Sequence, residues 1–252
     1  MDKRARRRGI FLLPNLFTTG CLCFGFLAVI FALEGDFGHA AGAVLIAMVF
    51  DGLDGRIARL TGTQTDFGVQ YDSLADMASF GLAPAIVAFQ WALGSTGAGG
   101  PWDNLGWLIA FLYVASAALR LARFNTQSGV GDKRYFQGLP SPAAAGAVVG
   151  MVWFGDAIGL AGIDAAVPVG IVTTLAAVLM VSAVRYVSFK EVDFRYRVRF
   201  TTVVAIVGGI ALVALHPPTA IFLGFFVYLL SGPVWTVMRL RRIQRRTGHG
   251  AP

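Results

Sequence analysis

Long apolar stretches separated by short polar segments run through most of the 252-residue chain. A helix needs roughly 20 predominantly apolar residues to cross a hydrocarbon layer about 30 Å thick. The pattern therefore predicts an all-α fold: one polytopic membrane helix bundle over residues 1–252, with eight transmembrane helices. The expected spans are 12–33, 39–60, 67–93, 104–124, 139–158, 165–184, 200–216 and 218–238.

The basic residues orient this bundle. An even number of spans puts both termini on one side, and eight spans put all 21 Lys and Arg on that side too. The cytoplasmic side of a membrane protein carries the excess of Lys and Arg. We therefore expect cytoplasmic termini, basic tails at 1–11 and 239–252, and a location in the inner (cytoplasmic) membrane. The basic residues are Lys3, Arg4, Arg6, Arg7, Arg8, Arg56, Arg59, Arg120, Arg123, Lys133, Arg134, Arg185, Lys190, Arg195, Arg197, Arg199, Arg239, Arg241, Arg242, Arg245 and Arg246.

The composition excludes several classes of protein. Hydrophobic residues make up 56% of the chain and charged residues 14%, whereas a soluble domain has about 25% charged residues. So little charge cannot cover a water-facing surface, and the same numbers exclude disorder. The net charge of +7 could indicate a nucleic-acid partner. Basic ends at a membrane surface suit anionic lipid headgroups instead, so we expect the lipid bilayer and no nucleic acid as partner.

Four aspartates occur inside the second and third expected spans, where an ionisable side chain is costly and usually functional. Asp51 and Asp54 lie near the cytoplasmic end of the second span, and Asp72 and Asp76 near that of the third. At about 100° per residue, the first two are ~60° apart and the last two ~40° apart around their helices. Two carboxylate pairs can therefore face each other across a helix–helix seam.

Four carboxylates at one seam repel one another unless cations neutralise them. Two divalent cations would balance the charge, and an all-oxygen ligand set favours Mg²⁺ or Mn²⁺ over zinc. Gly55, Ala58 and Gly68 leave room for a bulky ligand, and Arg59 can pair with phosphate. The residues alone thus predict a dimetal phosphoryl-transfer site at the cytoplasmic membrane surface. The alternative is structural ion pairing of the aspartates with Arg56 and Arg59.

Other notable residues of the spans are expected to be structural. Asp66 immediately precedes the third expected span, where we expect it to be the helix N-cap. Cys21 and Cys23 are about 200° apart on a helix, so they cannot share a metal. Glycine pairs such as Gly146 and Gly150 permit close helix packing, and they leave a homodimer as a possible assembly.

The spacing of these residues resembles the signature of the CDP-alcohol phosphatidyltransferases. The pattern is Asp51-x-x-Asp54-Gly55-x-x-Ala58-Arg59-x₈-Gly68-x-x-x-Asp72-x-x-x-Asp76. The resemblance implies an integral membrane enzyme that moves a phosphatidyl group from a CDP-linked lipid to an alcohol. It implies that Asp51, Asp54 and Asp72 hold the metals, and that Asp76 is both a ligand and the general base.

The same resemblance implies a set of contacts with the CDP moiety. The segment Pro14-Asn15-Leu-Phe-Thr18 is similar to the family's Pro-Asn-x-x-Thr segment, which carries nucleotide contacts over to its Asn and Thr. The expected CDP-binding residues are Asn15, Thr18, Gly55, Ala58, Arg59, Thr65 and Gly68.

Further stretches resemble the members of the family that use serine as the acceptor. They are 71–84 and Arg120-Leu-Ala-Arg123-Phe-Asn125 followed by 136–142. By the expected topology, Arg120 and Arg123 lie beside the aspartates, where they could hold the lipid phosphate or the serine carboxylate. Ordinary positive-inside anchoring is the alternative. The implied reaction consumes CDP-diacylglycerol and L-serine and releases phosphatidylserine and CMP.

Two other functions remain open on the sequence alone. The acceptor could be another alcohol, such as glycerol phosphate, inositol phosphate or choline, because the shared motif does not read the acceptor. The carboxylates could instead belong to an ion or metal transporter. Transport needs access from both sides of the membrane, whereas these acids lie toward one face.

The expected topology predicts the outcome of thiol labelling from outside intact cells. An impermeant reagent should reach Ser95→Cys or Ala98→Cys, which lie in a connection on the outer side. Ser128→Cys, in a cytoplasmic connection, should react only after the membrane is permeabilised. The unmutated chain, with its two cysteines, is the background control. Labelling of Ser128→Cys in intact cells would contradict the eight-span arrangement.

Overall fold

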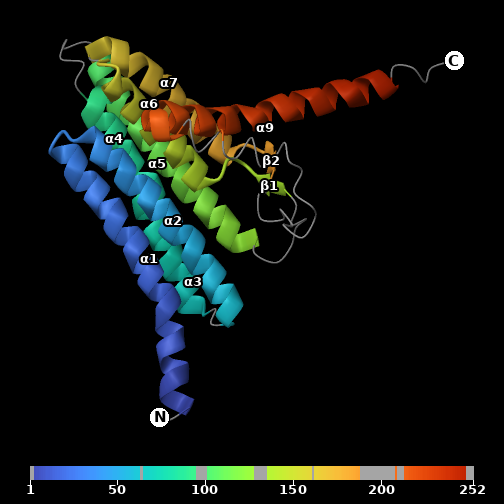
Figure 1. Cartoon of the computed structure of the whole chain (residues 1–252). Helices are drawn as coiled ribbons and strands as arrows, with labels where there is room; N and C mark the ends of the chain where they lie inside the picture. The colour runs from blue at the N-terminus through green and yellow to red at the C-terminus, as the bar shows by residue number, and fades with distance from the viewer. Residues whose placement is uncertain are drawn as a thin grey trace.

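The computed structural model describes residues 3–62, 65–94, 101–127, 135–160, 162–187, 208 and 213–247. Within them the chain is a bundle of long helices, as the sequence predicts (Figure 1). Two π-helical segments, η1 and η2, interrupt the third expected span without breaking it. The helical elements are α1 (Lys3–Leu33), α2 (Phe37–Thr61), α3 (Asp66–Asp76), η1 (Met77–Leu82), α4 (Ala83–Ala88), η2 (Phe89–Leu93), α5 (Pro101–Gln127), α6 (Ser141–Ala157), α7 (Gly162–Val181) and α9 (Pro217–Thr247).

Five helical stretches of the described chain are long and apolar enough to cross a membrane. The 25-residue α2 and the 17-residue α6 occupy two more of the expected spans. The expected span 200–216 lies mostly outside the described residues. A polytopic helical membrane protein is therefore confirmed, and the count of eight stays a prediction. The five stretches are Pro14–Leu33, Asp66–Leu93, Leu105–Thr126, Asp164–Val181 and Pro217–Thr236.

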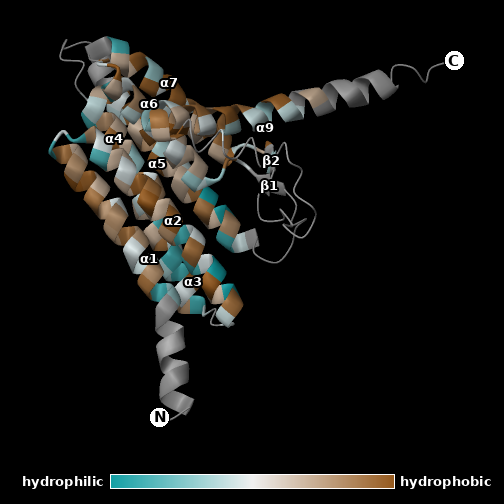
Figure 2. Cartoon of the chain, in the orientation of Figure 1, coloured by the Kyte–Doolittle hydropathy of each residue, from teal (hydrophilic) through white to brown (hydrophobic). Residues whose placement is uncertain are grey.

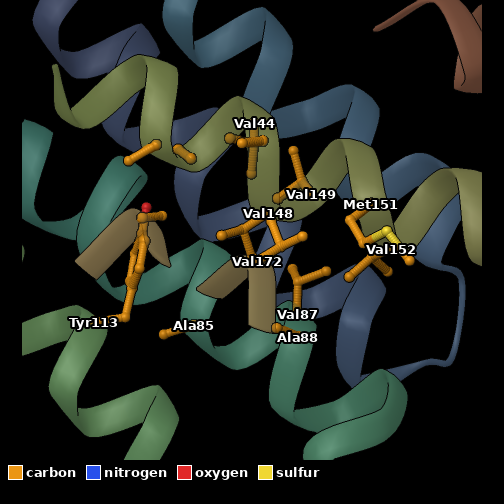
Figure 3. Packing of buried hydrophobic residues seen from close by; sticks show 14 of the residues in the cluster. Val44, Ala85, Val87, Ala88, Tyr113, Val148, Val149, Met151, Val152 and Val172 are labelled. Carbon is orange, nitrogen blue, oxygen red and sulfur yellow. The ribbon is translucent and has the colours of Figure 1, made fainter. Parts of the chain in front are cut away.

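Helix α6 lies in the middle of the bundle and packs against α2, α4, α7 and α9. Its inward residues are small, and Val148, Val149 and Val152 are fully buried (Figure 3). A Cβ added at Gly150 would lie only 3.1 Å from the Cα of Phe222 on α9. Small residues let helices approach this closely. This glycine therefore serves packing within the chain, and a homodimer stays a prediction.

A capped turn joins α1 to α2 at the end of α2 opposite its aspartates. Asp36 is the N-cap of α2 and accepts a hydrogen bond from the His39 backbone N–H at 3.0 Å. The His39 ring nitrogen Nδ1 lies 2.7 Å from the other carboxylate oxygen. These contacts with His39 lower the pKa of the Asp36 carboxyl. His39 is thus engaged at the end of α2 opposite the aspartates.

The N-cap of helix α3 is one residue earlier in the chain than the sequence predicts. The N-cap is Thr65, not Asp66: Thr65 has extended backbone angles, and its Oγ1 accepts from the Gly68 N–H at 3.0 Å. Asp66 is instead the first helical residue, where its negative charge favours the helix N-terminus. The prediction was wrong because both residue types cap well and only the backbone angles distinguish them.

A short antiparallel ribbon adds to the expected all-α fold. Strand β1 (Tyr135–Gln137) pairs with β2 (Arg185–Val187), with Phe136 opposite Tyr186. The Tyr186 side chain is buried, and its hydroxyl donates to the carbonyl of Leu229 on α9 at 2.8 Å. Three-residue strands give no periodic signal, so the sequence did not predict them. The ribbon ties the α5–α6 connection to the end of α7 and to α9.

The hydrophilic residues are unevenly distributed over the described helices. Figure 2 shows hydrophobic residues along most of the bundle and a gathering of hydrophilic residues where the ends of α2 and α3 come together beside α1. Helix α1 packs against both α2 and α3. The bundle therefore collects its polar groups at one end, where the four aspartates of the sequence motif are found.

Candidate active site

Three of the four aspartates converge between α2 and α3. One carboxylate oxygen from each of Asp51, Asp72 and Asp76 lies within 4.8 Å of the others. Asp72 and Asp76 are one turn apart, so their side chains leave the same face of α3, and Asp51 meets them from α2. The structure thus brings together oxygens that are up to 25 residues apart in the sequence.

Asp54 is buried beside this group but is not part of it. Its side chain is 4% exposed, and its Oδ2 accepts a hydrogen bond from Thr18 Oγ1 at 2.9 Å. The same hydroxyl lies 3.1 Å from the carbonyl of Pro14, so one proton serves two acceptors. Electrostatic interactions still link Asp54 to Asp72 and Asp51. Thr18, expected as a nucleotide contact, is therefore placed to orient an aspartate of the motif.

The converging carboxylates fit a hard divalent cation. Asp76 Oδ1 is buried and has no hydrogen-bond partner in the described part of the chain, and a buried polar atom left in this state is costly. The neighbouring Asp51 and Asp72 add charge of the same sign. Mg²⁺ and Mn²⁺ prefer carboxylate oxygens. Asp51, Asp72 and Asp76 therefore form a candidate metal site, with Asp54 behind it.

One group of the expected CDP contacts lies at the start of α3. A Cβ added at Gly68 would lie 3.1 Å from Thr65 Oγ1 and 3.6 Å from Asn15 Oδ1. Asn15 on α1 thus comes next to the N-terminal turn of α3, although 50 residues separate it from Thr65. The structure brings these three residues together, and a side chain larger than glycine at position 68 would crowd the other two.

A second group of expected CDP contacts lies on the last turns of α2. A Cβ added at Gly55 would come near only the Arg59 guanidinium, at 4.0 Å. The Arg59 side chain is exposed and Ala58 is half-buried. The helix then ends at Gly62, whose N–H donates to the carbonyl of Ala58 from a left-handed conformation with φ of 62°. Open space therefore remains beside Gly55 for a ligand.

Arg120 on α5 is the cation that the structure places beside the aspartates. It interacts electrostatically with Asp76 and Asp51. Its Nη1 donates to the hydroxyl of Ser141, the first residue of α6, at 2.9 Å, and its buried Nε has no hydrogen-bond partner among the described residues. Arg123 lies one turn nearer the end of α5.

Several polar residues that brace the site were not singled out by the sequence reasoning. Ser141 holds Arg120, as described above. Asn125 Nδ2 donates to Ser73 Oγ at 3.0 Å and joins α5 to α3. The Tyr71 hydroxyl lies 2.9 Å from Thr19 Oγ1 and joins α3 to α1. Each contact links helices distant in sequence. The three residues lie within the stretches 71–84, 120–125 and 136–142 quoted in the sequence analysis, and those stretches were the available signal.

The chain matches the sequence model of a known family. The family is described as CDP-alcohol phosphatidyltransferase, and the match covers residues 11–172. It thus includes the converging aspartates, the expected CDP contacts and Arg120.

Curated proteins similar to the chain carry related names. A CDP-diacylglycerol–serine O-phosphatidyltransferase of Helicobacter pylori is 33% identical over 93% of this chain and 95% of that protein. A protein of the same name from Mycobacterium leprae is 36% identical over 60% of this chain and 51% of its own length. An archaetidylserine synthase of Methanothermobacter thermautotrophicus is 32% identical over 69% of each.

The carboxylate cluster predicts how metal binding responds to substitution. Asp72→Asn removes one of three converging anionic ligands, so it should weaken Mn²⁺ binding by about tenfold or more. Electron paramagnetic resonance of the free Mn²⁺ in a titration measures this directly. Asp66→Asn, an exposed aspartate two turns earlier on the same helix, is the matched control and should bind Mn²⁺ normally. Equal affinity in both variants would show that the cluster is not the metal site.

Proposed function

The chain belongs to the CDP-alcohol phosphatidyltransferase family, and from that premise we propose that it transfers the phosphatidyl group of CDP-diacylglycerol to the hydroxyl of L-serine. The products are phosphatidylserine and CMP. One observation carries the proposal. Three motif carboxylates converge within 4.8 Å of one another, and the Arg120 guanidinium interacts electrostatically with Asp76.

Asp51, Asp72 and Asp76, with Asp54 behind them, are the residues that would hold two divalent cations, Mg²⁺ or Mn²⁺. Such cations stabilise negative charge on the phosphoryl oxygens and on the departing CMP. Thr18 keeps Asp54 oriented by its hydrogen bond. Asn15, Thr65 and Gly68 on one side, and Gly55, Ala58 and Arg59 on the other, are placed to take the CDP moiety.

Asp76 is the residue we assign to the proton transfer. The serine oxygen attacks the phosphorus that carries diacylglycerol, and the bond from that phosphorus to the CMP oxygen breaks. A serine hydroxyl is a poor nucleophile unless a base takes its proton as it attacks. Asp76 is the last of the aspartates along α3. With one of its carboxylate oxygens on a metal, the other can accept the proton.

Arg120 is the residue we assign to acceptor recognition. Serine carries a carboxylate that simple alcohols lack, and a guanidinium binds a carboxylate through two parallel hydrogen bonds. Ser141 engages one nitrogen of Arg120, and the buried Nε remains without a partner in the described residues. Arg123, one turn away, is placed to contribute to the lipid phosphate at the end of α5.

The proposed reaction fits a site on the cytoplasmic side of the inner membrane. With eight spans and both termini cytoplasmic, the ends of α2 and α3 that carry the aspartates face the cytoplasm. CDP-diacylglycerol then reaches the site from the bilayer, while serine and CMP exchange with the aqueous phase. The distribution of all 21 Lys and Arg supports this orientation.

A panel of acceptors tests the proposed function. Purified protein with CDP-diacylglycerol and Mg²⁺ or Mn²⁺ should release CMP when L-serine is added. Glycerol phosphate, inositol phosphate and choline should give little CMP under the same conditions. Release with one of these alcohols and not with serine would keep the family chemistry but overturn the acceptor.

Replacement of Arg120 by lysine tests its part in acceptor recognition. Lysine keeps the charge but loses the two-bond geometry. Arg120→Lys should therefore raise the KM for serine by about tenfold, a loss equivalent to one charge-assisted hydrogen bond, and leave the KM for CDP-diacylglycerol within about twofold. The reverse pattern would reassign Arg120 to the lipid phosphate. Arg56→Lys, an exposed arginine on α2, is the control.

The assignment of Asp76 as general base predicts a separation of binding from turnover. Asp76→Asn should lower kcat by roughly 10²–10⁴, the usual size of a general-base contribution. Binding of CDP-diacylglycerol, measured by calorimetry, should stay within a few-fold of the unmutated protein. Nearly normal kcat would remove Asp76 from the base role, and complete loss of lipid binding would make it a metal ligand first.

A further inference from the structure

A π-helical segment follows Asp76 directly. Residues Met77–Leu82 form η1, in which the Ala83 N–H reaches back five residues to the carbonyl of Ala78. Pro84 explains why the helix widens here. In an α-helix its ring would clash with the carbonyl four residues earlier, that of Phe80, and it has no N–H to donate to that carbonyl. A π turn relieves such a clash, and π turns often occur at functional sites.

Tyr113 supplies a hydrogen-bond donor to the carbonyl that Pro84, which has no N–H, cannot bond. Its hydroxyl donates to the Phe80 carbonyl at 3.0 Å, and both residues are completely buried. Figure 3 shows the Tyr113 ring among the packed side chains of the core. A buried carbonyl without a donor is costly. The bond from α5 therefore fixes the position of the π turn.

The same face of α5 continues to the site. Tyr113 and Arg120 are seven residues apart, about two turns, so they lie on one face of α5. A Cβ added at Gly81 would lie 3.3 Å from the Cβ of Ala117, which lies between them. Nearer the end of α5, Asn125 bonds to Ser73, and Arg120 interacts with Asp76. Helix α5 and the span formed by α3, η1 and α4 therefore run antiparallel, side by side.

The opposite side of the π turn is held by α1. Ser79 Oγ donates to the carbonyl of Cys21 at 3.1 Å. Gly25, one turn further along α1, lies so close that an added Cβ would come within 2.7 Å of the Ser79 Cα. The segment that follows Asp76 is therefore fixed between α1 and α5, and a rotation of η1 would break contacts on both sides.

We propose that Tyr113 is a positioning residue for Asp76. By bonding to the Phe80 carbonyl, it holds the π turn in the register that aims Asp76 at Asp51 and Asp72 and sets its separation from Arg120. Ser79 assists from the side of α1. The expected effect on catalysis rests on the proposed function, in which Asp76 is the base for the acceptor. The expected effect on metal binding is independent of the proposed function.

The test replaces Tyr113 by phenylalanine, which removes the hydroxyl and keeps the ring. Tyr186→Phe is the matched control: this tyrosine is equally buried, and its hydroxyl also donates to a helix carbonyl, that of Leu229 on α9. Three quantities are measured in each variant. One is the dissociation constant of Mn²⁺, by electron paramagnetic resonance. The others are kcat and the KM for CDP-diacylglycerol, from CMP release with serine.

Tyr113→Phe should raise the Mn²⁺ dissociation constant several-fold. It should also lower kcat about 10- to 100-fold, because a displacement of roughly 1 Å in a reacting group has this effect. The KM for CDP-diacylglycerol should stay within about twofold, since Asn15, Thr65 and Gly68 are untouched. Tyr186→Phe should leave all three quantities within about twofold. Normal Mn²⁺ affinity and kcat in Tyr113→Phe, or equal losses in both variants, would overturn the proposal.

Ser79→Ala provides a second variant if Tyr113→Phe does not fold. It removes the bond to Cys21 and adds no volume, and it should lower Mn²⁺ affinity and kcat in the same direction by several-fold. Unchanged values would overturn the proposal in that case. Failure of the unmutated protein to release CMP with serine would contradict the proposed function. The Mn²⁺ comparison would still decide whether Tyr113 positions Asp76.

Discussion

Mutual repulsion among clustered carboxylates is the constraint on which the rest of the structure depends. Asp51, Asp72 and Asp76 direct oxygens to one point between helices, and Asp54 is buried beside them. Like charges in a poorly solvated interface oppose the packing that holds them there. Such an arrangement persists when the surrounding helices fix it and a cation or a proton reduces its negative charge. The same constraint suits the cluster to the proposed function, because a prearranged set of carboxylate oxygens favours a hard cation, and such a cation can bind a phosphate.

The helices around the cluster supply that rigidity through a few specific contacts. Thr18 bonds to Asp54 and ties α1 to α2, and Asn125 bonds to Ser73 and ties α5 to α3. Small residues elsewhere, such as Gly150 and Gly25, let the helices approach closely enough for dispersion forces to hold the bundle together. Since apolar side chains gain little from leaving lipid, close packing and buried hydrogen bonds take the place of the hydrophobic effect.

The proposed function separates two tasks along one helical span. In that proposal the first turns of α3, with Gly68 next to Asn15 and Thr65, take the nucleotide, and Asp76 and the nearby Arg120 act on the acceptor. Asp72 lies between the two. A π turn directly after Asp76 lets the helix accommodate Pro84 without displacing this row. The residues proposed for the metal, the nucleotide and the acceptor are therefore adjacent, as a direct transfer between two substrates requires.

The sequence by itself determined the helical spans, the four aspartates and their spacing, because hydropathy and the one-turn repeat of Asp72 and Asp76 are local properties of the chain. It also placed the signature that defines the family. Only the tertiary structure decided that Asp54 accepts a hydrogen bond from Thr18, 36 residues away, and that Tyr113 donates to the carbonyl of Phe80. Hydrogen bonds between distant segments leave no periodic trace in a sequence.

The same reason explains the two differences between expectation and structure. Thr65 and Asp66 both suit a helix N-cap, and the extended backbone angles of Thr65 decide between them. The ribbon of β1 and β2 pairs segments about 50 residues apart and three residues long. In both cases the residue types permitted more than one local structure, and the packing of the surrounding helices selected one of them.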